Sequence, residues 1–293
     1  MNFKCIECTM KKADYLLELF GKDEEKSVRL RKEVLEIIKA SPESETSPNL
    51  NARVMRFLNN QLEMGDIYYE VKKEYNRYLL SREKEIMKKI NSSGDRLLSA
   101  LKYAMTGNFI DFGAMNEVDS EELNGLIEKA YAQHIDAEEY KQFKADLERA
   151  NRIVYLADNA GEIVFDKVFI KVIKEKYPDV SITVGVRGMP IHNDATMGDA
   201  EETGITSFVD VISNGTDIPG TEMGKISTQA REAIERADVI IAKGQGNFET
   251  LFGSGRNIYY IFLCKCSLFA ERFKVDKFKG IFVNERNVKE MID

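Results

Sequence analysis

The sequence contains no apolar run that approaches the roughly 20 residues needed to span a membrane. Its first residues, Met-Asn-Phe-Lys-Cys, lack the apolar segment of a secretory signal. Only four of the 293 residues are cysteines, which is too few to indicate a disulfide scaffold. We therefore expect a cytoplasmic protein that has no membrane partner.

Positive charge is not in excess either, because 42 Lys and Arg residues stand against 49 Asp and Glu residues. The resulting net charge of -7 argues against nucleic acid as the main partner. The hydrophobic fraction of 43% is high enough for a substantial core. The length fits one large domain or two of ordinary size.

Several motifs of well-known enzyme classes are also missing. No Gly-x-Gly-x-x-Gly follows the first predicted strand, and Gly244-Gln245-Gly246 lacks the third glycine, which disfavours a dinucleotide site. There is no Walker A sequence and no Gly-x-Ser-x-Gly elbow. Only two histidines occur, His134 in a charged helical stretch and His192 in a loop rich in polar residues.

The first third of the chain carries a helical pattern. Residues 12–101 are rich in Lys, Glu, Leu, Arg and Met, with apolar residues at helical spacing. The charged residues here are typical of solvated helix faces. A punctuated loop is predicted at Ser41–Pro48. We expect a helical bundle domain over residues 1–106, followed by a connecting loop and helices over 107–150 that contribute to the site.

From Ile153 the pattern changes to alternating strands and helices, which predicts a Rossmann-like α/β/α domain over residues 151–293 with a mostly parallel sheet. Between the strands, helices are predicted over Glu162–Lys176 and Gly224–Ala237. The predicted strands are Ile153–Ala157, Ile182–Val186, Phe208–Ile212, Val239–Ala242, Ile258–Leu263 and Ile281–Val283.

Polar side chains follow four of these strands, and the carboxyl ends of parallel strands share one edge of a sheet, where ligands bind. In chain order, the segments after the strands are Asp158-Asn159, Arg187 to Thr196 with His192 and Asp194, Ser213 to Thr216, and Lys243 to Glu249 with Gly244 and Asn247.

The chemistry of these segments indicates a phosphate site that uses a metal. Carboxylate and amide oxygens suit a hard divalent cation such as Mg²⁺ or Mn²⁺. The charges of Arg187 and Lys243 suit phosphate oxygens. Gly244 and Gly246 let backbone N–H groups approach an anion. Together these groups are typical of phosphoryl transfer.

The same segments resemble the metal-dependent damage-control phosphatase family, in particular its small prokaryotic branch. The resemblance rests on Asp-Asn-Ala-Gly-Glu from Asp158, Asn-Asp-Ala-Thr from Asn193, and Lys-Gly-Gln-Gly-Asn-Phe-Glu from Lys243. Gly-Asn-Phe-Ile-Asp-Phe-Gly at 107–113 is similar to a further loop of that family. Four motifs in the same order span nearly the whole chain.

The resemblance implies a function and a set of site residues. It implies hydrolysis of phosphate esters of small metabolites, such as sugar phosphates, with Mn²⁺ or Mg²⁺ as cofactor and Co²⁺ or Ni²⁺ as alternatives. Asp158, Asn159 and Asp194 match the metal ligands, and Lys243 matches the residue expected to hold the phosphate. Asn108 and Asp111 match residues that line the same pocket.

A catalytic role is therefore expected for Asp158, Asp194 and Lys243. The expected substrate-binding residues are Asn108, Asp111, Arg187, Lys243, Gly244 and Asn247. Either water or the Asp158 carboxylate is expected to attack phosphorus, and the sequence leaves both open.

The four cysteines form two close pairs. Cys5 and Cys8 are expected to share a helix face, and Cys264 and Cys266 a strand face. If the two pairs meet, four thiolates could hold zinc or act in redox chemistry. Small buried cysteines are common, however, so packing is the competing interpretation.

Two other functions remain as alternatives. An S-adenosylmethionine-dependent carboxyl methyltransferase could use the same sheet, although Asp158-Asn159-Ala160-Gly161 stands where its glycine-rich loop would be. A non-enzymatic metabolite-binding protein could use the helical part as a partner surface. Amphipathic faces of a bundle have the same pattern in a core and in an interface, so no oligomeric state is predicted.

Overall fold

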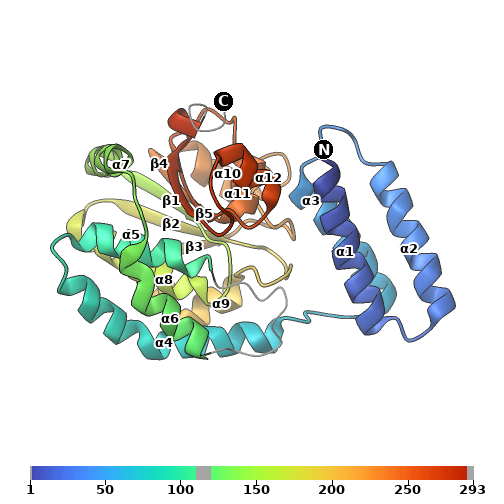
Figure 1. The fold of residues 1–293 in the computed structure, drawn as a ribbon. Coiled ribbons are helices and arrows are strands. Elements are labelled where there is room, and N and C mark those ends of the chain that lie inside the picture. The colour runs from blue at the N-terminus through green and yellow to red at the C-terminus, as the bar shows by residue number, and fades with distance from the viewer. Residues whose placement is uncertain (1, 110–119, 289–293) are drawn as a thin grey trace.

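The computed structural model describes residues 2–109 and 120–288, and Figure 1 shows their arrangement. Three helices come first and lie together at one side of the molecule. They are α1 (Phe3–Phe20), α2 (Glu24–Lys39) and α3 (Ser47–Leu62). Each has an oxygen-bearing cap, because the side chains of Asn2, Asp23 and Thr46 accept hydrogen bonds from backbone N–H groups of the first turn.

The next helices pack near the sheet. They are α4 (Tyr69–Asn91), α5 (Arg96–Gly107), α6 (Ser120–Lys129) and α7 (Ala137–Arg149), with a 3-10 turn η1 (Ala130–Ala132) between the last two. Asp95 caps α5 and Asp136 caps α7. Good caps at both starts explain why these helices begin where the sequence changes from turn residues to amphipathic runs.

A six-stranded sheet forms the centre of the fold, in the order β3-β2-β1-β4-β5-β6. Five strands are parallel, and β6 runs antiparallel to β5. The strands are β1 (Arg152–Leu156), β2 (Ser181–Val186), β3 (Asp210–Ser213), β4 (Val239–Lys243), β5 (Ile258–Leu263) and β6 (Gly280–Asn284). The connecting elements are α8 (Glu162–Lys176), α9 (Met197–Thr203), η2 (Ile205–Ser207), α10 (Thr228–Glu235), α11 (Gly244–Leu251), α12 (Ser267–Phe273) and η3 (Glu285–Asn287).

The two faces of the sheet belong to two different cores, as the alternation of side chains along a strand requires. On β1, Ile153 and Tyr155 pack with α4, α5, α7, α8 and α9 on one face. Val154 and Leu156 pack with α10, α11 and α12 on the other face. The expected α/β/α domain with a mostly parallel sheet is therefore confirmed, and the polar segments do leave one edge.

The helical region divides at a different place from the expected boundary at residue 106. Helices α1, α2 and α3 share a small core of their own that includes Leu16, Leu30 and Leu58. Helices α4 and α5 instead contribute Leu79, Leu101 and other residues to the core of the sheet. We call α1–α3 the three-helix unit. It joins the rest through residues 63–68 and through contacts with the loops that leave the sheet (Figure 1).

Several local boundaries also differ from the expected ones. Helix α10 begins at Thr228 rather than Gly224, because Ser227 caps it. The third strand begins at Asp210 rather than Phe208, because the preceding residues Ile205–Ser207 form a 3-10 turn and Phe208 packs, partly buried, against the core. Helix α3 begins at Ser47, inside the expected loop, because Pro48 fits the first turn of a helix and Thr46 caps it. None of the described helices is both long enough and apolar enough to cross a bilayer.

Candidate active site at the carboxyl edge of the sheet

Asp158 and Asn159 leave β1 at the centre of the sheet and meet the loop after β2. An antiparallel bridge joins Asn159 to Asp194. In this bridge the N–H of Ala195 donates to the carbonyl of Asp158 over 2.7 Å, and the N–H of Ala160 donates to the carbonyl of Asn193 over 2.8 Å. The backbone thus brings together the three residues expected to bind a metal.

The Asp158 carboxylate is the most exposed acid of this group. Its side chain retains 13% exposure, against 5% for Asp194 and 0% for Glu162. Its Oδ2 atom accepts hydrogen bonds from Nδ2 of Asn108 at 3.0 Å and from Nδ2 of Asn159 at 2.9 Å. Approach from outside is therefore easiest at Asp158.

Burial and neighbouring acids act on Asp158 together. Desolvation raises its pKa most, and the charges of Asp194 and Glu162 raise it further, to about 7, against the opposing effect of Lys265 and Arg187. Burial also raises the pKa of Asp194. Burial thus makes the charged form of both aspartates less favourable, and a positive charge bound beside them would oppose that effect.

Arg187 bridges the two aspartates. Its Nε atom donates to Oδ2 of Asp194 at 2.6 Å, while Nη2 lies 3.6 Å from Oδ1 of Asp158. Nη1 donates to the carbonyl of Gly220 at 3.0 Å, so the guanidinium also fixes the loop after β3. Nη2 is buried and has no hydrogen-bond partner among the described residues. This nitrogen faces Asp158 and makes no hydrogen bond, so a ligand oxygen beside that carboxylate could accept one from it.

Lys243 lies deeper than the expected phosphate-holding role requires. Its side chain is fully buried, and Nζ donates to Oε1 of Glu162 at 2.5 Å, to Oδ1 of Asp166 at 2.6 Å and to the carbonyl of Ala104 at 2.8 Å. An ammonium group has three N–H donors, so this set uses all of them. Contact with phosphate would require the loss of one of these hydrogen bonds.

The two acids that hold Lys243 respond to it in different ways. Burial alone would raise the pKa of Glu162, but the charge and hydrogen bonds of Lys243 prevail and lower it. For Asp166, burial dominates and raises the pKa to about 6, despite Lys243. Asp166 also accepts a hydrogen bond from the hydroxyl of Tyr155 at 2.6 Å.

Gly244 begins α11 directly against Asp158. Its φ of +78° favours glycine, and a Cβ there would lie 2.1 Å from the carboxyl carbon of Asp158. Asn247 is fully buried one turn later, and its Nδ2 donates to the carbonyl of Lys243 at 2.7 Å. Its Oδ1 accepts from the hydroxyl of Thr221 at 2.7 Å. The structure therefore gives Asn247 contacts with the surrounding loops.

Asn108 at the end of α5 connects three elements. Besides Asp158, its Nδ2 donates to both carboxylate oxygens of Glu162, at 3.2 and 3.1 Å. Its Oδ1 accepts from the N–H of Leu263 on β5 at 2.9 Å. Of the two residues expected from this segment to bind substrate, Asn108 thus lies beside Asp158, whereas Asp111 lies outside the described residues.

A family model for the damage-control phosphatase ARMT1-like domain matches residues 1–280. The chain belongs to this family. It is 33% identical over 282 residues to an uncharacterised protein of Methanocaldococcus jannaschii, covering 93% of this chain and 91% of the relative. It is 37% identical over 189 residues to a damage-control phosphatase of Pyrococcus horikoshii, covering 64% of each chain. A damage-control phosphatase of Archaeoglobus fulgidus is 31% identical over 272 residues, covering 89% of this chain and 91% of the relative.

A solved structure agrees with this membership. The crystal structure of a DUF89 family protein from Pyrococcus horikoshii superimposes with a TM-score of 0.85 at 28% identity, covering 97% of this chain and 99% of that chain. The resemblance noted in the sequence is therefore confirmed. Membership in a phosphatase family favours phosphate ester hydrolysis over the methyltransferase and binding-protein alternatives.

The donor set of this phosphatase fits a hard cation. Two carboxylates with raised pKa values face each other across Arg187, and a bound cation would offset their charge. Asn159 uses its Nδ2 atom toward Asp158 and Glu162, which leaves its carbonyl oxygen Oδ1 as the ligating atom. Within residues 2–109 and 120–288, no group of three His, Cys, Asp or Glu is placed to hold a metal. A metal at this site would need the amide and water as ligands in addition to the two carboxylates.

Several residues of this site were not predicted from the sequence. Lys265, directly after β5, exerts its charge on Asp158, Glu162 and Asp194, and it is only half-buried. The sequence could have indicated Lys265, because this residue follows a parallel strand and therefore lies at the same edge of the sheet as Lys243. The sequence could also have indicated Glu162 and Asp166. These two acids are four residues apart and interrupt the apolar face of α8.

Helix α4 contributes two polar residues to the site that periodicity alone does not reveal. The Nζ atom of Lys72 lies 3.3 Å from the carbonyl oxygen of Asp194, and Oδ1 of Asn76 accepts from the N–H of Gly161 at 2.6 Å. Both side chains are buried. They connect the first helix after the three-helix unit to the loops that follow β1 and β2.

The cysteines are free thiols in this structure. Burial raises the pKa of Cys264 to about 12 and also raises those of Cys5 and Cys8. The first turn of α1 lies against α12, because Nζ of Lys4 is 2.8 Å from Oε1 of Glu271. The two pairs of cysteines therefore belong to elements in contact, but protonated thiols are poor metal ligands and nucleophiles.

Proposed function

We propose that this protein is a divalent-metal-dependent phosphatase that acts on a small phosphorylated metabolite. The observation that carries the proposal is the pair Asp158 and Asp194, held by Arg187 and a backbone bridge at the carboxyl edge of the sheet. Burial makes their charged forms less favourable, so they suit a bound cation, and a cation beside positively charged groups suits phosphate.

Three residues would hold the metal, and two others would hold the phosphate. Asp158, Asn159 and Asp194 are the ligands. When bound, a divalent cation stabilises the negative charge that develops on phosphoryl oxygens. Nη2 of Arg187, which is buried and makes no hydrogen bond among the described residues, donates to a phosphate oxygen. Lys265 adds a second positive charge at the same edge.

Lys243 has a positioning role in this proposal. It forms ion pairs with both Glu162 and Asp166 and keeps Glu162 in place. Glu162 in turn accepts hydrogen bonds from Asn108 and Asn159, the two amides that also donate to Asp158. The buried lysine thus orients the Asp158 carboxylate through two amide side chains.

Phosphate release tests the proposal. Chelator-treated protein is assayed with p-nitrophenyl phosphate and a panel of sugar phosphates, with Mg²⁺, Mn²⁺, Co²⁺ or Ni²⁺ added back. We expect turnover only with added metal, and its loss in Asp158→Ala. Turnover that is independent of metal would contradict the proposal, as would a fully active Asp158→Ala variant.

Isotope labelling and trapping with borohydride together identify the nucleophile. In a single turnover in H₂¹⁸O, attack by water places ¹⁸O in the released phosphate. Attack by the Asp158 carboxylate forms an aspartyl phosphate, whose hydrolysis at carbon labels the aspartate and whose hydrolysis at phosphorus labels the phosphate. Borohydride added during turnover therefore decides between them, because it reduces an aspartyl phosphate to homoserine with release of phosphate and leaves a free carboxylate unchanged, which mass spectrometry of the Asp158 peptide detects.

A further inference from the structure

One face of α4 contacts both loops that carry the expected metal ligands. Lys72 and Asn76 are four residues apart, so their side chains leave the helix on the same side, and they retain only 3% and 0% exposure. Oδ1 of Asn76 accepts from the N–H of Gly161 at 2.6 Å, and its Nδ2 donates to Oδ1 of Asp199 at 2.9 Å. Nζ of Lys72 lies 3.3 Å from the carbonyl oxygen of Asp194. Helix α4 therefore helps to fix the loops after β1 and β2.

Lys72 is a buried cation held between two carboxylates. Its Nζ atom is 3.4 Å from Oδ2 of Asp66 and 3.4 Å from Oδ2 of Asp199. Asp199 is itself fixed at the start of α9, because the same oxygen accepts from the backbone N–H and the hydroxyl of Thr196, each at 2.8 Å. The two acids thus keep the ammonium group beside the backbone of Asp194.

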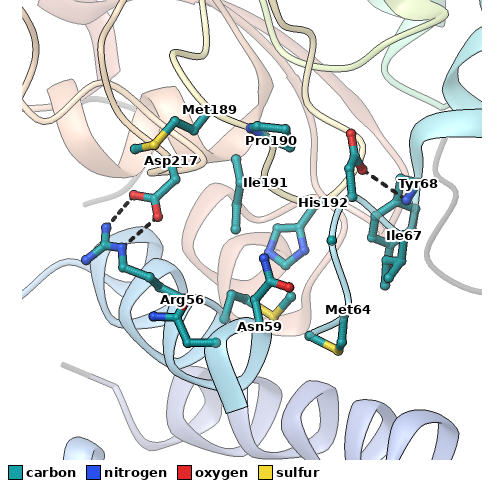
Figure 2. A pocket seen from close by; sticks show the side chains of 14 residues that line it. Arg56, Asn59, Met64, Ile67, Tyr68, Met189, Pro190, Ile191, His192 and Asp217 are labelled. Atoms are coloured by element: carbon teal, nitrogen blue, oxygen red, sulfur yellow. Dashed lines mark hydrogen bonds and ion pairs between the residues drawn. The ribbon is translucent and has the colours of Figure 1, made fainter. Parts of the chain in front are cut away.

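Asp66 comes from a different part of the molecule. It lies in residues 63–68, which join the three-helix unit to α4, and its Oδ1 accepts from the N–H of Tyr68 at 3.0 Å. Figure 2 shows Met64–Tyr68 of this segment around the same cavity as Met189–His192 of the loop after β2. A displacement of the three-helix unit would therefore move one of the two acids that hold Lys72.

The charge and the position of Lys72 have opposite effects on a cation bound at Asp194. Burial raises the pKa of Asp194, and the positive charges of Arg187 and Lys72 oppose that rise. By charge alone, removal of Lys72 would strengthen cation binding, because two positive charges repel each other. Removal of a group that orients a ligand residue instead weakens metal binding, commonly by about 10- to 100-fold. The measured direction therefore identifies which effect dominates.

We propose that Lys72 is a positioning residue for the metal ligand Asp194, and that Asp66 makes this positioning depend on the placement of the three-helix unit. The inference rests on the proposed metal-dependent function, in which Asp194 is a ligand. Lys72 holds the carbonyl of Asp194 so that its carboxylate stays beside that of Asp158. A shift of residues 63–68 moves Asp66, draws Lys72 away from the loop and lowers the affinity for the metal.

Titration of chelator-treated protein with Mn²⁺ tests the inference, with free Mn²⁺ measured by electron paramagnetic resonance. In Lys72→Met, which keeps a long side chain without the ammonium group, we expect the Kd for Mn²⁺ to rise about 10-fold. Lys167→Met is the matched control. Lys167 is also a buried lysine between α4 and α8, and its Nζ lies 2.7 Å from Oε2 of Glu83. Its replacement should lower stability in urea but keep the parent Kd.

A double-mutant cycle tests the link to residues 63–68. Asp66→Asn keeps an acceptor for the N–H of Tyr68 but removes the charge that faces Lys72, and we expect a rise in Kd of about 3-fold. Added to Lys72→Met, it should cause no further rise, because Asp66 acts through Lys72. Effects that multiply in the double variant would overturn the link. Asp66→Asn is also the milder substitution, and a folded Asp66→Asn protein with the parent Kd would overturn the link as well.

The inference and the proposed function fail in different ways. A parent protein that binds no Mn²⁺ overturns the metal-dependent function and the inference that rests on it. If the parent binds Mn²⁺ and Lys72→Met binds it equally well or more tightly, only the positioning role is overturned. The same holds if Lys167→Met loses as much affinity as Lys72→Met, because any disturbance between α4 and α8 would then have the same effect.

Discussion

Two groups of buried charges lie side by side at the edge of the sheet, and they are built differently. In the inner group, Lys243 is fully buried between Glu162 and Asp166, and all its donors are used. In the outer group, Arg187 is shared by Asp158 and Asp194, and its Nη2 atom faces Asp158 at 3.6 Å without making a hydrogen bond among the described residues. The cation of the inner group thus has all its donors engaged, although Oδ2 of Asp166 makes no hydrogen bond there, whereas the cation of the outer group retains a donor for a ligand.

This comparison separates residues that hold the site from residues that act on a substrate. A buried cation whose donors are all engaged fixes the geometry of its neighbours. Its removal should mainly lower the free energy of unfolding. A partly exposed charged group can bind a metal or a substrate. Its removal should mainly lower the activity. The predictions below test that separation.

Of the substitutions considered, one in the outer group should have the largest effect, and that effect should be on activity. Asp158→Asn removes a charge from the metal site, and we expect kcat to fall by about 10³-fold, because electrostatic stabilisation of the transition state depends on the metal being held. Steady-state assays with saturating Mn²⁺ measure this. Asp179→Asn, an exposed site between α8 and β2, is the control and should keep full activity.

A substitution in the inner group should mainly change the free energy of unfolding. Lys243→Met leaves Glu162 and Asp166 buried without their cation, which we expect to lower the free energy of unfolding by about 3 to 5 kcal/mol in urea denaturation. Adding Glu162→Gln and Asp166→Asn to this variant should restore much of the loss. Normal stability combined with a raised KM would show instead that Lys243 binds phosphate, and the distinction between the two groups would fail.

Lys265 provides an intermediate case, since it is half-buried but acts on the acids of both groups. We expect Lys265→Met to raise KM about 10-fold, in line with the loss of one charge-assisted hydrogen bond to phosphate. The free energy of unfolding should change by less than about 1 kcal/mol. The exposed Lys277→Met is the matched control. A fall in kcat at constant KM would place Lys265 outside the phosphate site.

The smallest effect concerns pH in the absence of metal. Burial and the charges of Asp194 and Glu162 raise the pKa of Asp158 from 3.8 to about 7, so the folded state binds this proton more tightly than the unfolded chain does. Its contribution to stability is therefore complete below about pH 4 and is lost as the pH rises toward 7.

We expect chelator-treated protein to lose about 1 to 2 kcal/mol of unfolding free energy between pH 5 and pH 8. Chemical denaturation at each pH measures this loss, which Mn²⁺ should reverse and Asp158→Asn should flatten. Equal pH dependence in the parent and in Asp158→Asn would mean that the outer group is already balanced without metal.

The sheet and the edge that carries the polar loops could be predicted from the sequence. Ile153–Ala157 and the other apolar runs have the lengths and flanking turn residues of buried strands. It also placed Asp158, Asn159 and Asp194 together, since parallel strands end on the same side. The roles of the lysines were harder to assign. Lys243 and Lys265 both follow parallel strands, and only the packing of α8 shows that the first is enclosed by Glu162 and Asp166.

Contacts made by helices could not be derived in the same way. Helical periodicity identifies an inner face but not the element that covers it. For this reason the sequence pattern places α4 and α5 in one bundle with the preceding helices, although their apolar faces pack on the sheet. The polar contacts of Lys72 and Asn76 with the site depend on that packing and were missed with it.

The ion pairs and amides around Asp158 all belong to the part of the chain from α4 onward, whereas α3 contacts the loops of the sheet from outside, through Asn51 with His192 and Arg56 with Asp217. During evolution, substitutions on the remaining surface of α3 could therefore accumulate while the groups around Asp158 were kept.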